Sequence, residues 1–87
     1  MNKLPYEQLA DMLNAARGRV VPGSKWQHYK GGEYTIDHMV LLEDTSEVAV
    51  IYAPVSHPDI SFVRPLTSWL ETVEWNGETM PRYVEIG

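Results

Sequence analysis

The 87-residue sequence contains no cysteine, which excludes disulfide bonds and zinc sites built on thiolates. It also has no apolar run near the roughly 18 residues that a transmembrane helix requires. The first residues do not form the apolar stretch of a signal peptide. We therefore expect a cytoplasmic protein without a membrane partner.

The motifs that carry common chemistry are missing as well. No glycine-rich phosphate loop precedes a predicted helix, and no serine stands in a nucleophile elbow. The three histidines match no zinc-binding spacing, and no pair of carboxylates suggests a general acid and base. We therefore predict no catalytic residue, no metal site and no cofactor, and an enzyme is the least favoured class of function.

Basic residues are few and unevenly placed along the chain. Residues 1–30 hold five basic and two acidic residues, a net charge of +3, whereas residues 31–87 hold two basic and ten acidic residues, a net charge of −8. The overall charge of −5 disfavours the many phosphate contacts that non-specific nucleic acid binding requires. A local basic patch remains compatible with binding of one anion.

One amphipathic helix is predicted near the N-terminus. Pro5 suits the first helical turn, where a missing N–H has no cost, and Gly18 suits the position just after the last turn. The pattern predicts a helix over residues 5–17 that packs against the rest of the chain through one apolar stripe. The stripe consists of Tyr6, Leu9, Met12, Leu13 and Ala16.

The remainder of the chain has the pattern of short strands separated by turns. Asn76-Gly77 is the strongest two-residue hairpin signal, and the paired glycines Gly31-Gly32 also indicate a turn. A strand is predicted over residues 48–55. Its residues 48–53 do not alternate apolar and polar side chains, so we expect it to be covered on both faces, with the helix as one cover. The other predicted strands are residues 25–29, 34–42 and 61–64, followed by one helical turn over 66–71 and a hairpin from residue 73 onward.

These elements predict a single domain over residues 1–87 that is mostly β. We expect a small, partly open SH3-like barrel of about five strands, formed by residues 20–87, with the one N-terminal α-helix packed against it.

Four basic residues stand close to aromatic residues in the sequence: His28, Lys30, Arg64 and Arg82. Arg64 precedes a proline and Arg82 follows one, and proline stiffens the local backbone. Arginine beside aromatic rings suits the binding of carboxylates, phosphates or flat rings. The candidate ligand-binding residues are His28, Lys30, Tyr34, Tyr52, Arg64, Trp69 and Arg82.

A structural role for the same residues is the alternative. Arginine stems pack over tryptophan and tyrosine, and guanidinium groups pair with carboxylates such as Glu71 or Glu74. Aromatic residues in a small β domain usually belong to its core. Convergence of Arg64 and Arg82 on one open surface favours binding, whereas burial of both in internal ion pairs favours a scaffold.

Five short motifs follow one another in the order His28-Tyr29-Lys30-Gly31-Gly32-Glu33-Tyr34, Val50-Ile51-Tyr52, Phe62-Val63-Arg64-Pro65-Leu66, Trp69-Leu70-Glu71 and Pro81-Arg82-Tyr83. In this order they resemble a small bacterial family, the domain of unknown function 1653. The resemblance covers about residues 20–87 and leaves the N-terminal helix outside. Phe62 stands where many relatives have tryptophan and Trp69 where they have phenylalanine, which indicates a volume swap within one aromatic cluster. The resemblance implies a compact β domain and brings no activity, substrate or cofactor.

Two non-enzymatic functions therefore lead the hypotheses. The first is a binding module for an anionic or aromatic ligand, such as a peptide carboxylate or a nucleotide. The second is an interaction protein that self-associates as a homo-oligomer, or docks on a protein partner, through the helix and exposed strand edges.

Overall fold

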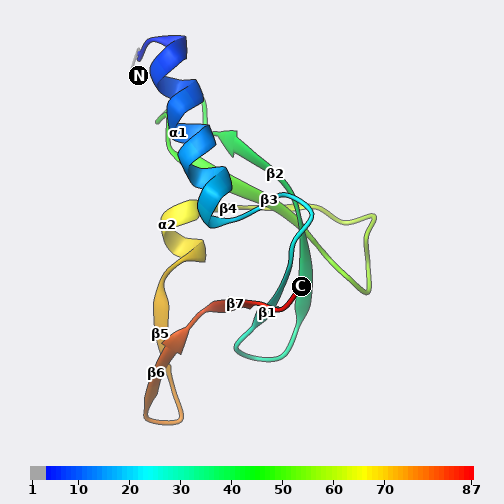
Figure 1. Ribbon diagram of the computed structural model, residues 1–87. Coiled ribbons are helices and arrows are strands. Elements are labelled where there is room, and N and C mark those ends of the chain that lie inside the picture. Colours follow the sequence, from blue (N-terminus) through cyan, green and yellow to red (C-terminus); the bar gives the residue numbers. More distant parts are fainter. Residues whose placement is uncertain (1–3) are drawn as a thin grey trace.

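The computed structural model describes residues 4–87, which are mostly β-strand (Figure 1). In chain order the elements are α1 (Tyr6–Arg19), β1 (Lys25–His28), β2 (Glu33–Leu41), β3 (Val48–Pro54), β4 (Phe62–Pro65), α2 (Leu66–Trp69), β5 (Thr72–Trp75), β6 (Glu78–Pro81) and β7 (Tyr83–Glu85). Within these residues no helix is long and apolar enough to cross a membrane.

The strands of residues 4–87 form two antiparallel sheets. The larger has five strands in the order β4-β3-β2-β1-β7, and the smaller is the β5–β6 hairpin. The five-stranded sheet does not close on itself, because β4 and β7 stand at opposite ends of this order. The fold is therefore mostly β and partly open, as the sequence predicts, with the hairpin extending away from the larger sheet (Figure 1).

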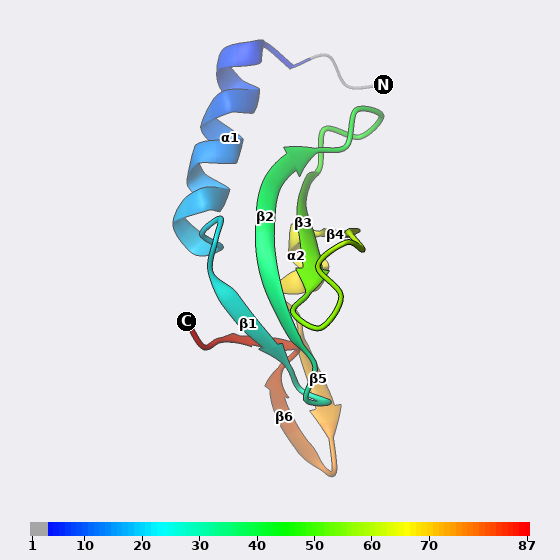
Figure 2. The ribbon, with the colours of Figure 1, turned by 90° about the vertical axis from the view of Figure 1, so that its right-hand side faces the viewer.

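The core lies on one face of the larger sheet, under α2 and the C-terminal part of α1. Figure 2 shows α1 alongside β2, and α1 contacts both β2 and β3. The predicted packing of the helix on the strand at residues 48–54 is thus confirmed. The buried core residues are Ala16, Val20, Trp26, Ile36, Met39, Val50, Tyr52, Trp69 and Tyr83.

The helix differs from the sequence prediction at both ends. Tyr6 is 90% exposed, so its inclusion in the buried stripe was wrong. The residues of the stripe that pack into the core are mainly Ala16 and the half-buried Leu13. Gly18 lies inside the last turn rather than after it. The helix continues because it carries Val20 into the core, where Val20 is fully buried and its N–H donates to the Ala16 carbonyl at 2.9 Å.

The β5–β6 hairpin has the predicted turn. Asn76 and Gly77 both have positive φ angles, 53° and 78°, which is the signature of a type I′ turn. The flanking pairs are Trp75 opposite Glu78 and Glu74 opposite Thr79. The turn chemistry therefore sets the register of this hairpin.

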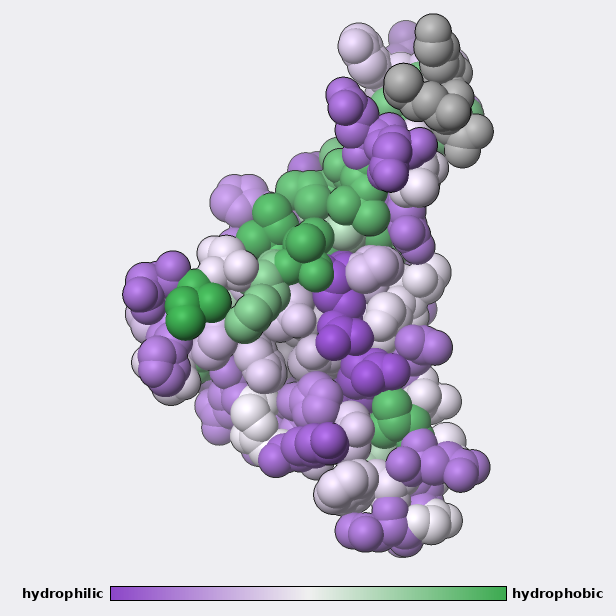
Figure 3. All heavy atoms as spheres, turned by 180° about the vertical axis from the view of Figure 1, so that it is seen from behind, coloured by the Kyte–Doolittle hydropathy of each residue, from purple (hydrophilic) through white to green (hydrophobic). Residues whose placement is uncertain are grey.

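The opposite face of the larger sheet carries a band of apolar side chains (Figure 3). On this face Ile51 of β3 lies between His38 of β2 and Val63 of β4, and Val63 is 56% exposed. Ala49 and Ala53 of β3 are buried on this face but Ile51 is only half-buried, so the burial predicted for both faces of this strand is found in part.

Candidate functional site

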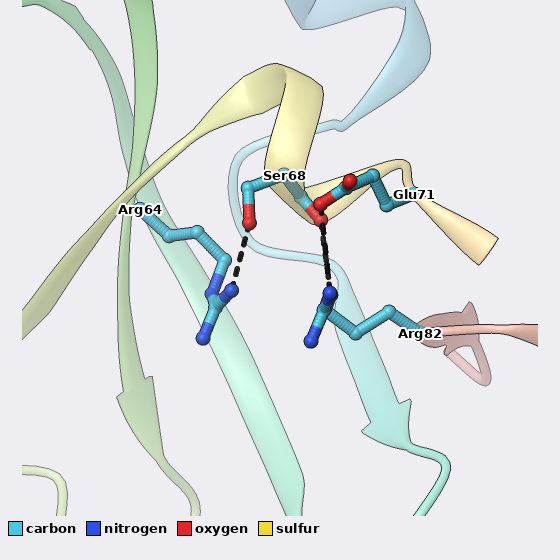
Figure 4. A network of polar contacts seen from close by, with 4 residues as sticks. All are labelled: Arg64, Ser68, Glu71 and Arg82. Carbon is cyan, nitrogen blue, oxygen red and sulfur yellow. Dashed lines mark hydrogen bonds and ion pairs between the residues drawn. The ribbon is translucent and has the colours of Figure 1, made fainter. Parts of the chain in front are cut away.

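Two arginines from distant parts of the chain converge on the short helix α2. Arg64 lies near the end of β4, and Pro65 is both the last residue of this strand and the N-cap of α2. Ser68 is therefore placed one helical turn after Arg64. Arg64 Nη1 donates to Ser68 Oγ at 2.8 Å, and Arg82 Nε donates to the Ser68 carbonyl at 3.2 Å. Figure 4 shows the two guanidinium groups approaching Ser68 from opposite sides.

The two arginines differ in their carboxylate partners. Arg82 Nη2 lies 3.5 Å from Glu71 Oε1, and the Glu71 side chain is 58% exposed. Among residues 4–87, no carboxylate lies within ion-pair distance of Arg64. The Arg64 Nε is buried and has no protein acceptor. The predicted pairing with Glu71 is thus found for Arg82 alone, and Glu74 forms no ion pair with either arginine.

Tyrosine rings surround the Arg64 guanidinium. Its Cζ lies 5.8 Å from the centroid of the Tyr83 ring. A hydrogen bond with the Tyr52 hydroxyl raises the pKa of Arg64, so the guanidinium remains charged. Burial, and then a hydrogen bond with Tyr52, raise the pKa of Tyr83, so this phenol remains neutral at physiological pH. Tyr83 therefore offers a neutral hydroxyl beside a fixed positive charge.

The floor beneath the arginines is an aromatic stack. Trp69 lies parallel to Tyr83, with ring centroids 3.7 Å apart and an interplanar angle of 5°. Tyr52 meets Trp69 edge-on at 4.8 Å, and Tyr34 meets Tyr52 edge-on at 5.4 Å. Such contacts hold the rings rigidly, which fixes the position of the polar groups above them.

His28 joins the arginines through the strand pairing of β1 with β7. It lies opposite Tyr83 in the sheet, and the two rings meet edge-on at 5.0 Å. Partial burial lowers the pKa of His28, and the positive charges of Arg82, Lys30 and Arg64 lower it further. All three cations therefore act on one imidazole ring. His28 Nδ1 accepts a hydrogen bond from the Lys30 backbone N–H at 3.1 Å, which requires an unprotonated Nδ1.

The structure brings most, but not all, of the predicted residues to an accessible position. His28, Tyr34, Arg64 and Arg82 are half-buried, and Lys30 is exposed at the margin. Tyr52 is 6% exposed and Trp69 is fully buried, so these two belong to the floor. The Lys30 Nζ lies over the rings of Tyr29 and Trp75, 5.7 Å from each centroid.

Sequence reasoning missed two residues of this site. Ser68 receives both arginines, and its position four residues after Arg64, across a proline that begins a helical turn, is the signal that identifies it. Tyr83 packs against Arg64, His28 and Trp69, and its place directly after Arg82 in the closing motif is the corresponding signal. In the described part of the chain, no three His, Asp or Glu side chains are grouped to hold a metal ion.

Comparisons with known proteins agree with the resemblance seen in the sequence. The family described as "Protein of unknown function (DUF1653)" matches residues 24–85, a range that includes the whole site and excludes α1. A crystal structure of a protein of this family from Bordetella bronchiseptica is similar to this chain, with a TM-score of 0.67 and 27% sequence identity. The similarity covers 79% of this chain and 91% of that one. No curated protein matches the sequence. The chain therefore belongs to the DUF1653 family.

Proposed function

We propose that the protein is a non-enzymatic binding module whose ligand carries a carboxylate or phosphate group, held by Arg64 and Arg82. The observation that supports it best is the state of Arg64. Its guanidinium is charged and half-buried, yet no carboxylate among residues 4–87 pairs with it. A cation withdrawn from water without a partner is costly, and an anion from a ligand would remove that cost.

The balance of hydrogen-bond donors and acceptors supports the same function. A guanidinium has five N–H donors and no acceptor, and it binds carboxylate or phosphate oxygens in bidentate fashion. Ser68 Oγ and the Tyr52 hydroxyl form hydrogen bonds with the Arg64 guanidinium, while Arg64 Nε has no protein acceptor. Arg82 adds further positive charge and donors at the same short helix. An acceptor-rich, negatively charged group is the chemical complement of this cluster.

A scaffold role accounts for Arg82 better than for Arg64. Arg82 Nε donates to a carbonyl at the end of α2, and its second contact is the exposed Glu71. These bonds tie the residue that precedes β7 to the end of α2 and the residues after it, without any ligand. Arg64 ties β4 to α2 through Ser68 Oγ, but a neutral donor would serve a hydroxyl acceptor equally well. The positive charge at Arg64 is the feature that a scaffold leaves unexplained.

Isothermal titration calorimetry of the full chain tests the proposal. Inorganic phosphate, acetate and adenosine monophosphate are titrated at low ionic strength into the wild type, Arg64→Met and a control, Arg17→Met. Arg17 is an exposed arginine of α1 that donates to the Asn14 side chain at 3.0 Å. We expect saturable binding of at least one anion by the wild type and the control, and at least tenfold weaker binding by Arg64→Met. A wild type that binds none of the three anions contradicts the proposed function.

Self-association is a second candidate function, favoured by the apolar band on the open face of the sheet (Figure 3). Exposed apolar side chains gather around the edge strand β4, and the proposed occupant is a second copy, since two edge strands can pair antiparallel and join their apolar faces. The residues involved are Val55, Ile60 and Val63. Sedimentation velocity of the wild type and Val63→Lys tests it: we expect a dimer that the substitution dissociates, and a wild-type monomer at all concentrations contradicts it.

A further inference from the structure

The Ser68 hydroxyl carries a proton for which the fold has no acceptor. Its oxygen accepts a hydrogen bond from Arg64 Nη1 at 2.8 Å, and the residue is half-buried. A serine hydroxyl has one O–H donor besides its acceptor lone pairs. Among residues 4–87, no group accepts the Ser68 hydroxyl proton. The hydroxyl is therefore a free donor for a ligand bound beside Arg64.

Free N–H donors of both arginines flank this hydroxyl. Arg64 lies on one side of Ser68 and Arg82 on the other, with the serine between them (Figure 4). Arg82 donates from Nε to the Ser68 carbonyl and from Nη2 to Glu71, so its Nη1 has no partner in the described part of the chain. The buried Arg64 Nε has no acceptor there either. Three donor groups, two guanidinium ions and one hydroxyl, therefore meet at one residue.

Three donor groups around one serine match a ligand with three oxygens. A carboxylate has two oxygens in one plane, and a single guanidinium satisfies both of them in bidentate fashion. A phosphate monoester has three strong acceptor oxygens that diverge from one phosphorus. Such a group places one oxygen toward Arg64, one toward Arg82 and one toward the Ser68 hydroxyl.

The charge of the site favours the same ligand. Each guanidinium carries one positive charge, and a hydrogen bond with Tyr52 raises the pKa of Arg64 further. Glu71 offsets little of the Arg82 charge, because its contact is long, at 3.5 Å, and its side chain is 58% exposed to solvent. A phosphate monoester carries about −1.5 to −2 at pH 7, whereas a carboxylate carries a single negative charge. The monoester is therefore the closer match to two arginines.

We propose that the ligand of this site is a phosphate monoester, and that the Ser68 hydroxyl donates to one of its oxygens between Arg64 and Arg82. The inference rests on the proposed function, in which the two arginines hold an anion. It adds a third binding residue and ranks carboxylates below phosphate monoesters as ligands. Two sources share this chemistry: a small phosphorylated molecule, and a phosphorylated serine in a peptide.

The test compares methyl phosphate, dimethyl phosphate and acetate by isothermal titration calorimetry of the full chain, at a slightly alkaline pH where the monoester is a dianion. Dimethyl phosphate keeps the phosphorus but has only two charged oxygens, as acetate does. We expect the wild type to bind methyl phosphate at least tenfold more tightly than either of the others. A wild type that binds dimethyl phosphate or acetate as tightly as methyl phosphate overturns the inference while leaving the anion site intact. A wild type that binds none of these anions, nor inorganic phosphate, instead overturns the proposed function.

Ser68→Ala and a control, Thr67→Val, each remove one hydroxyl from α2. Thr67 is exposed and its hydroxyl donates to Glu47 at 3.5 Å, away from the arginines. We expect Ser68→Ala to bind methyl phosphate at least about fivefold more weakly and acetate nearly unchanged, because only the monoester uses the hydroxyl. Ser68→Thr, which keeps a hydroxyl, and Thr67→Val should bind both anions as the wild type does. Equal weakening of both anions by Ser68→Ala means that Ser68 only positions Arg64, and overturns the direct contact with the ligand.

A short phosphopeptide distinguishes the two sources. Acetyl-Ala-phosphoserine-Ala-amide is compared with methyl phosphate and with the unphosphorylated peptide on the wild type. Binding of the phosphopeptide more tightly than methyl phosphate identifies a phosphorylated peptide as the ligand, and weaker binding identifies a small phosphate monoester. In both cases the unphosphorylated peptide should bind at least tenfold more weakly than the phosphopeptide, and equal binding of the two peptides overturns the inference.

Discussion

Substitution of Arg64 by methionine removes the guanidinium but keeps much of the apolar stem. In the structure this guanidinium donates a hydrogen bond to Ser68 Oγ at 2.8 Å, forms another with the Tyr52 hydroxyl, and lies over the Tyr83 ring. The variant therefore loses charge-assisted hydrogen bonds. It also relieves the desolvation of a half-buried cation for which the described residues supply no carboxylate.

The two effects oppose each other in the free energy of unfolding. A hydrogen bond to a charged group contributes about 1.5–3 kcal/mol. Relief of an unpaired, partly desolvated charge offsets much of this amount. We expect a net change within about 1 kcal/mol, which for a domain of this size corresponds to about 4–8 °C in melting temperature. An anion present at 100 times its Kd stabilises the wild type by about 2.7 kcal/mol, so its effect is the larger one.

Urea unfolding and thermal unfolding, each with and without phosphate, measure both quantities. We expect near-normal stability of Arg64→Met without phosphate, and loss of the phosphate-induced rise in melting temperature that the wild type shows. A scaffold arginine predicts the reverse. A fall of about 3–5 kcal/mol, as for a buried ion pair that loses one partner, together with a surviving phosphate response, would refute the reasoning.

Other positions test the fold and the electrostatics of the site. Gly77→Val should lower stability by about 1–3 kcal/mol in urea unfolding, because Gly77 has a φ of 78° that a β-branched residue rarely adopts. Gly18→Ala, in the last turn of α1 with open space around the added Cβ, should instead raise stability by a few tenths of a kcal/mol to about 1 kcal/mol. Equal effects at the two glycines would contradict the type I′ turn. Leu13→Ala should cost about 1–2 kcal/mol, less than the usual range for a buried leucine because Leu13 is half-buried, and an unchanged urea midpoint would show that α1 does not stabilise the sheet. The wild type should lose stability as the pH falls below about 6.5, because an unfolded chain protonates His28 at its ordinary pKa while burial and nearby cations hold the folded pKa lower. His28→Gln should flatten this part of the profile of stability against pH, whereas His57→Gln, at an exposed loop position, should not. Identical slopes of stability against pH in the wild type and His28→Gln would count against the field of the three cations.

Local signals in the sequence predicted most of the fold. Asn76-Gly77 fixes a hairpin by backbone conformation alone, and the non-alternating residues of β3 indicate a central strand. The helix boundary depends on tertiary packing instead. Glycine at position 18 is a common stop signal, but the burial of Val20 favours two further helical residues, and Gly18 tolerates a helical position with open space around it.

The site was only partly predictable, since its geometry depends on contacts between residues far apart in the chain. Arginine beside proline and aromatics identified Arg64 and Arg82 as unusual, but their meeting at Ser68 requires α2 to dock beside both β4 and β7. The same docking buries Trp69 completely, which no local pattern shows. Tyr83 enters the site through the pairing of β7 with β1, a pairing between the end of the chain and its first strand.

The proton affinity of His28 tests the anion site most directly. Its ring lies beside Tyr83 and within the electrostatic field of Arg82, Lys30 and Arg64, so an anion bound to the arginines must offset part of that field. The measurement is an NMR titration of the His28 ring against pH, with and without saturating phosphate, in the wild type and in Arg64→Met. The account predicts that phosphate raises the pKa of His28 in the wild type and leaves it unchanged in the variant. A His28 pKa that does not respond to phosphate in the wild type would contradict an anion site at Arg64 and Arg82.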